Sequence, residues 1–146
     1  MTTHEINTES EFNDVQIGYQ LIRMELADFE IRSKREIKDG LLNFKVEINH
    51  TISEDGQVQV NAKISILHDS ESLSSTTIIC TFLIENYKEW LDLQGLTNGQ
   101  LPTELANLIN GITISSLRGV MFIKLQDTFL ESVILPIVDM QEFQNR

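Results

Sequence analysis

The stretch LLNFKVEINHTISEDGQVQVNAKISILHDSESLSSTTIICTFLIE, residues 41–85, decides the fold, because apolar residues recur at every second position in it. In its first two segments one parity is apolar and the other is polar. Strict alternation of this kind indicates a strand that buries one face. The apolar parity holds Leu42, Phe44, Val46, Ile48 and Ile52 in the first segment, and Val58, Val60, Ala62, Ile64 and Ile66 in the second. Both strands therefore need a cover on one face.

The connections between these segments predict an antiparallel meander. Residues 53–56 (SEDG) supply a turn that ends in Gly56, where a positive φ angle is cheap. The third segment, from Thr76 to Glu85, is apolar on both parities, which indicates a strand covered at least in part on both faces. Three strands in succession follow from this pattern.

Upstream of the meander, residues 14–31 predict one long bent strand. The apolar parity changes near residues 21–22 and again near residues 27–28, and a bulge or kink lets a strand change face without ending. Residues 1–13 are polar and acidic, so we expect a flexible N-terminal tail. A chain of 146 residues fits one domain, which we place at residues 14–146.

Downstream, a helix is expected to begin near Pro102 or Thr103, because proline is tolerated in the first helical turn and threonine is a fair N-cap. Its apolar stripe supplies the missing cover for the sheet. The stripe comprises Leu101, Leu105, Leu108, Ile109, Ile112 and Ser116. Residues 120–138 are largely apolar without a clean period, so we expect them either to extend the helix in part or to run extended over the body, with regular structure ending at Pro136. For residues 139–146 we expect at most one short helical turn.

Composition excludes several classes of partner. The chain carries 22 acidic and 11 basic residues, a net charge of −11, which disfavours nucleic acid and anionic lipid. With Cys80 as the one cysteine, no intramolecular disulfide can form, and a reducing compartment is the simpler assumption. Residues 1–10 lack the pattern of a secretory signal, and residues 78–84, the longest nearly apolar run, are too short to cross a bilayer. We expect a cytoplasmic protein that does not insert into membranes.

The sequence holds no catalytic motif, neither a phosphate-binding loop nor a nucleophile elbow nor a zinc-protease signature. His50 and His68 fall on the apolar parity of neighbouring strands and could share a metal, or be ordinary strand-end histidines; no cysteine or carboxylate stands beside them at ligand spacing. Asp28 and Glu30 form no convergent acid–base pair, and a cysteine in an apolar strand usually packs as a small hydrophobe. We predict no enzyme, metal or cofactor.

Three segments together resemble the SecB export-chaperone family. They are QIGYQLIRMELADFEIRSK (16–34), TTIICTFLIENYKEW (76–90) and LPTELANLINGITISSLRG (101–119), followed by the Leu-Pro pair at 135–136. Their order and spacing over residues 15–140 carry the resemblance. It implies an α+β fold with a SecB-like four-stranded antiparallel sheet, covered by a long C-terminal helix.

The resemblance also implies a function. SecB proteins are not enzymes; they are ATP-independent holdases for non-native polypeptides, including preproteins, and form homo-oligomers, usually dimers of dimers. Clients lie in apolar grooves between sheet edge, crossover loop and helix. Carried over to this chain, the client-binding residues are Tyr87, Trp90, Leu91, Leu93 and Leu96, with Met121 and Phe122 as additions.

The family docks the SecA motor on the outer sheet face, and Glu30 matches one docking residue. Thr81, however, stands where the family has a glutamate after the strand cysteine, which argues against SecA as a partner. The resemblance leaves two roles open, namely a chaperone for protein export and a chaperone for the antitoxin of a toxin–antitoxin set. A small-molecule or lipid carrier using the gap between sheet and helix is the alternative from another class, and a subunit whose apolar surfaces serve only its own assembly is the third.

Overall fold

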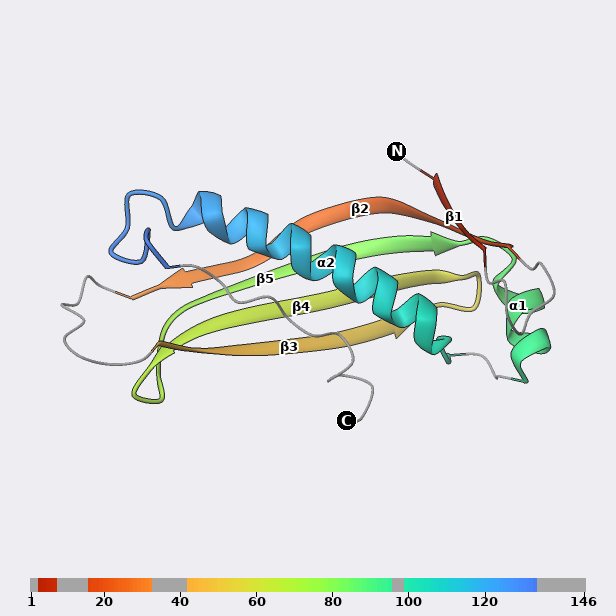
Figure 1. Cartoon of the computed structure of the whole chain (residues 1–146), viewed down its shortest axis with the longest axis horizontal. Helices are drawn as coiled ribbons and strands as arrows, with labels where there is room; N and C mark the ends of the chain where they lie inside the picture. Colours follow the sequence, from red (N-terminus) through yellow and green to blue (C-terminus); the bar gives the residue numbers. More distant parts are fainter. Residues whose placement is uncertain (1–2, 8–15, 33–41, 96–98, 134–146) are drawn as a thin grey trace.

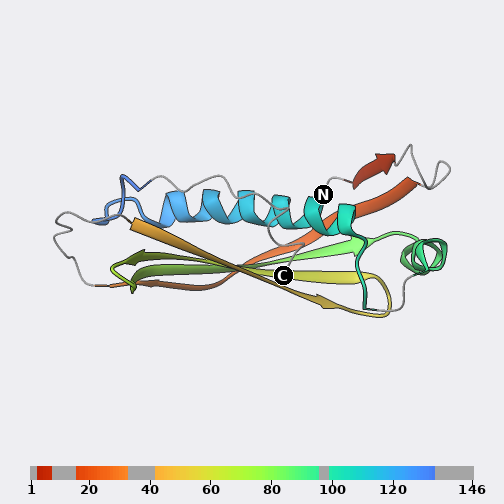
Figure 2. The same cartoon turned by 60° about the horizontal axis from the view of Figure 1, so that its bottom comes forward.

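A five-stranded antiparallel sheet lies beneath one long helix in the computed structural model, which describes residues 3–7, 16–32, 42–95 and 99–133 (Figures 1 and 2). The strand order is β1-β2-β5-β4-β3. The elements are β1 (Thr3–Asn7), β2 (Gln16–Ile31), β3 (Leu42–Ile52), β4 (Gln57–His68), β5 (Glu71–Ile84), α1 (Tyr87–Gln94) and α2 (Thr103–Lys124). The predicted α+β class, the meander and the covering helix are confirmed.

The helix crosses the sheet face that carries the apolar parity of β4. Val58, Ala62 and Ile66 are fully buried, while Gln57 and Gln59 on the other parity are exposed. α2 contacts β4 and β5, two inner strands of the sheet. Helix and sheet together therefore form one core, as the alternation predicted.

The β3–β4 turn has the expected glycine. Gly56 has a φ of 87°, and its N–H donates to the carbonyl oxygen of Ser53 at 3.3 Å. The carbonyl oxygen of Gly56 in turn accepts a 2.9 Å hydrogen bond from the N–H of Ile84. The turn is thus tied to the end of β5.

Replacing Gly56 with alanine should lower the free energy of unfolding by about 2–3 kcal/mol. A Cβ there would lie 2.8 Å from the backbone oxygen of Ile84 and 3.0 Å from Cβ of Tyr87. Gly99 is a matched control, because it has the same φ of 87° with nothing within 4 Å of its Cβ position. Gly99→Ala should cost only about 1 kcal/mol. Equal losses in urea unfolding would contradict the steric argument.

Strand β2 is bent where the sequence predicts. Its register against β5 shifts between Leu21 and Arg23, and again between Leu26 and Asp28. Each shift inserts an extra residue and returns the apolar side chains to the face under α2. The two parity changes in the sequence are therefore bulges in one continuous strand.

The structure corrects the prediction of a flexible tail over residues 1–13. Thr3–Asn7 form strand β1, which pairs antiparallel with residues 16–20 of β2. An edge strand gains its hydrogen bonds from the backbone and needs no apolar face of its own, so its composition gave no signal. The remaining residues of that segment lie outside the described parts of the chain, as do residues 134–146.

Helix α2 begins at Thr103, as predicted, but Pro102 occupies the N-cap position and no side-chain hydrogen bond caps the helix, so the expected threonine N-cap is wrong. Its buried face is rotated from the predicted stripe: Leu101, Leu108, Ile112 and Ser116 are only half-buried. The buried residues are Leu105, Ile109, Asn110, Thr113, Ile114, Leu117 and Met121. Thr113 can face the sheet because its hydroxyl donates to the carbonyl oxygen of Ile109 at 2.8 Å, so a polar residue replaces an apolar one in the stripe.

By length and composition alone α2 could also cross a bilayer, which the sequence prediction overlooked. A core helix passes the same test, and the buried residues of α2 pack on the sheet.

Candidate functional site

Strand β3 is an open edge of the sheet within the described residues, since it pairs only with β4. The N–H of Ser53 donates to Gln57 at 2.8 Å, and the β3–β4 register runs from there without a shift. In an antiparallel pair, residues alternate between pointing their backbone groups at the partner strand and away from it. The backbone N–H and C=O groups of Val46, Ile48 and His50 therefore point outward and have no partner strand within the described residues.

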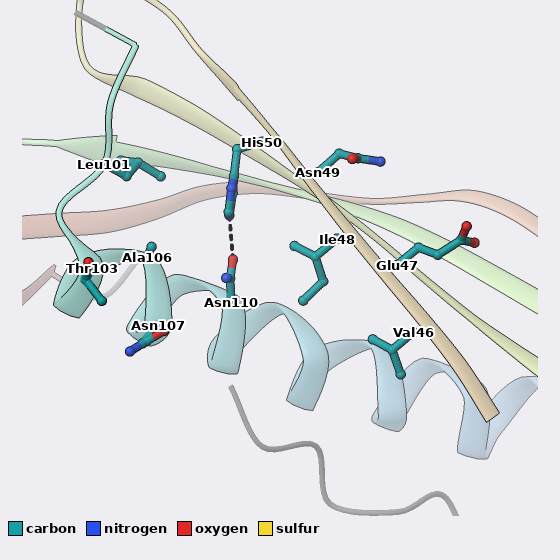
Figure 3. Close-up of a pocket in the computed structure, with 10 residues that line it drawn as sticks. All are labelled: Val46, Glu47, Ile48, Asn49, His50, Leu101, Thr103, Ala106, Asn107 and Asn110. Atoms are coloured by element: carbon teal, nitrogen blue, oxygen red, sulfur yellow. Dashed lines mark hydrogen bonds between the residues drawn. The ribbon is translucent and has the colours of Figure 1, made fainter. Parts of the chain in front are cut away.

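A groove of about 480 Å³ runs between this edge and the first half of α2. Figure 3 shows the side chains of Val46, Ile48 and His50 on the helix side of β3, with Glu47 and Asn49 on the opposite side. Across the groove stand residues before and within α2, namely Leu101, Thr103, Ala106, Asn107 and Asn110. The groove thus combines walls of mixed apolar and polar side chains with a strand edge that no other described strand pairs with.

One polar pair joins the two walls. His50 Nε2 and Asn110 Oδ1 are 2.6 Å apart (Figure 3). A carboxamide oxygen can only accept, so His50 is the donor. Asn110 is 4% exposed, while His50 lies at the surface. The pair ties the edge strand to the covering helix.

Three of the predicted client-binding residues lie inside the protomer. Tyr87, Leu91 and Met121 are 4%, 3% and 0% exposed. The Tyr87 hydroxyl donates to the carbonyl oxygen of Gln100 at 3.0 Å and accepts from the N–H of Gly99 at 3.3 Å. These side chains serve packing, and Tyr87 also pins the crossover segment.

Phe122, by contrast, is 67% exposed. It lines a second hollow of about 510 Å³ beside Gly119, Leu125 and Val133, at the far end of α2. Trp90 and Leu93 belong to α1, but their side chains lie outside the described residues, and so does Leu96 entirely. The predicted crossover loop contains α1, a short helix that its turn-rich sequence did not predict.

The predicted docking residue Glu30 is exposed. It alternates with Phe29, whose ring lies 5.3 Å from the Lys124 ammonium of α2, so Glu30 lies on the sheet face away from the helix. Thr81 lies on that outer face as well, because it pairs with Arg23 and Gln59, which are both exposed. Thr81 itself is only 4% exposed.

The candidates for catalysis and metal binding do not come together. Cys80 is fully buried, and burial raises the pKa of its thiol, with a smaller opposing effect from Thr113. His50 pairs with Asn110, whereas His68 stands at the other end of β4, 3.8 Å from Asp69. The described residues contain no group of three potential metal ligands.

The resemblance predicts a groove between a sheet edge and the helix, but none of the client-binding residues that it names, as far as the structure describes their side chains, lines the groove beside β3. Alternation places Val46 and Ile48 on the apolar face of a strand, but it cannot tell an edge strand from a central one. Asn110 was the available signal, since it is a polar residue one helical turn from Ala106 on a largely apolar helix.

Comparison with known proteins identifies the fold. No protein-family model matches the chain, and no curated protein matches it. Among solved structures it is similar to a SecB-like chaperone of Mycobacterium tuberculosis in complex with a ChAD peptide from the HigA1 antitoxin. The TM-score is 0.53 at 14% identity, and the match covers 82% of this chain and 90% of that chain. The chain therefore has the SecB-like fold that its sequence predicts.

Proposed function

We propose that this chain is a non-catalytic, ATP-independent chaperone that holds extended segments of non-native polypeptides in the groove between β3 and α2. The observation that carries the proposal is a strand edge without a partner in the described part of the chain, beside a half-apolar groove, in a fold similar to that of a chaperone solved with a bound peptide.

The chemistry of the groove suits a client without fixed sequence. An extended segment can pair with the outward backbone groups of Val46, Ile48 and His50, which supplies affinity independent of side chains. Its alternate side chains then lie against Val46, Ile48 and Leu101. Many weak contacts of this kind permit release, which a holdase requires.

The proposal includes self-association through strand β2. Strand β1 pairs only with residues 16–20, so residues 21–31 of β2 have no partner strand on that side within the described chain. Met24 and Leu26 on this stretch are 52% and 45% exposed. An unpaired edge with exposed apolar side chains favours pairing with a second copy.

A narrow client, such as an antitoxin, fits the proposal better than general export, because Thr81 departs from the SecA-docking pattern. The carrier alternative gains no support, because it needs a closed pocket, whereas the space between α2 and the central strands is filled. Phe82, Ile109 and Leu117 are fully buried there in one core cluster.

The proposal predicts that the purified protein suppresses aggregation of an unfolding client at a near-stoichiometric ratio without ATP. Light scattering of a thermally unfolding reporter protein measures this directly. An acidic protein of similar size, added at the same concentration, controls for crowding and charge. If scattering stays unchanged at every ratio, the chain is not a holdase.

A further inference from the structure

The polar pair at the centre of the groove carries a specificity that apolar walls alone would lack. Asn110 is 4% exposed, and its Oδ1 is occupied by the hydrogen bond from His50. Its amide nitrogen carries two further donors, for which the described part of the chain supplies no acceptor. Asn110 lines the groove, so these donors are available to an occupant.

We propose that Asn110, oriented by His50, is a specificity-determining residue that donates a hydrogen bond to an uncharged polar side chain of the client, such as a hydroxyl or a carboxamide. This inference rests on the proposed chaperone function. The amide nitrogen of Asn110 is not among the fully buried atoms that lack a partner in the described residues, so water reaches it while the groove is empty. A client displaces that water, and a donor then left without an acceptor costs free energy, so a client that offers an acceptor at this point is preferred over one that does not.

The geometry selects a side chain as the acceptor. A segment paired with β3 directs its backbone groups within the plane of the sheet, and every second side chain toward the helix. Asn110 projects from α2 above that plane, toward the side chains of β3 (Figure 3). It therefore meets a helix-facing side chain of the client rather than its backbone.

Electrostatic complementarity calls for an uncharged acceptor. Glu47 belongs to the lining of the groove, but its side chain points to the side of β3 opposite the helix, whereas Val46, Ile48 and His50 face the helix (Figure 3). The helix wall contributes threonine, alanine and asparagine side chains. A charged client side chain in the helix-facing row would therefore lose hydration without an ion-pair partner in that row. The preferred occupant is an extended segment of apolar residues with one neutral polar residue in its helix-facing row.

The inference is tested with two kinds of uncharged peptide. The reference peptide has valine at every helix-facing position. Each peptide of the matched series has threonine in place of one of these valines, at a different position in each. Valine and threonine have the same shape, so the comparison isolates the hydroxyl. The wild-type protein should bind one threonine peptide about threefold to tenfold more tightly than the all-valine peptide. Asn110→Leu should abolish that preference, whereas His50→Gln, which keeps a donor toward Asn110, should retain it.

A measurement on the wild-type protein guards against a variant that misfolds. With either peptide at saturation, the side-chain amide protons of Asn110 should lie further downfield with the preferred threonine peptide than with the all-valine peptide. Equal affinity for all peptides, with equal amide shifts, overturns the role of Asn110 but leaves the holdase proposal standing. Failure to bind any peptide or unfolded client overturns both.

Discussion

Phe82→Ala should lower the free energy of unfolding by about 3–5 kcal/mol, enough to threaten the fold of a domain of this size. Phe82 is fully buried on the central strand β5, opposite Leu21 on one side and Val58 on the other. Truncating it leaves a cavity where α2 packs on the sheet. Urea denaturation followed by circular dichroism measures the loss.

Phe122→Ala is the matched control, because this side chain is 67% exposed on α2. Its removal should change stability by no more than about 0.5 kcal/mol. Should Phe82→Ala prove as mild as Phe122→Ala, the sheet–helix interface would not be the core of the protein.

Ile48→Asp should weaken binding of an unfolded client about 100-fold while leaving the protein folded. Ile48 lies on the groove side of β3 and is only half-buried, so the monomer tolerates a carboxylate there. A bound client would bury that carboxylate against apolar side chains, at a cost of about 2–3 kcal/mol. Fluorescence anisotropy with a labelled unfolded client measures the change in Kd.

Asn49→Asp provides the control for charge. Asn49 is the next residue on the same strand, but it points to the opposite side (Figure 3) and is exposed. The Asn49→Asp substitution adds the same charge outside the groove and should change the Kd for the client by less than about twofold. Equal loss in both variants would mean that overall charge, not the groove, governs binding.

Much of the fold could be predicted from local sequence patterns. Side-chain alternation predicts the meander and the two bulges in β2, and the Pro-Thr pair at 102–103 predicts the start of α2. Strand β1 could not be predicted, because backbone pairing leaves no pattern in the side chains of a short polar segment. The true buried face of α2 could not be predicted either. Thr113 belongs to that face because its hydroxyl is hydrogen-bonded within the helix.

The site was harder to predict than the fold, because the two depend on different information. The resemblance directed attention to aromatic residues around the crossover segment, yet Tyr87 is needed to hold that segment in place. The groove depends on which strand forms the edge of the sheet and on how α2 crosses the sheet. The apolar alternation around Val46 and Ile48 determines neither of these.

Hydrogen exchange of the β3 backbone amides, measured with and without a bound unfolded client, tests the central claim most directly. The outward amides of Val46, Ile48 and His50 should exchange more slowly once the client is bound, because it occupies their hydrogen-bonding positions. A client that binds stoichiometrically while these three amides exchange at their free rates would contradict the account.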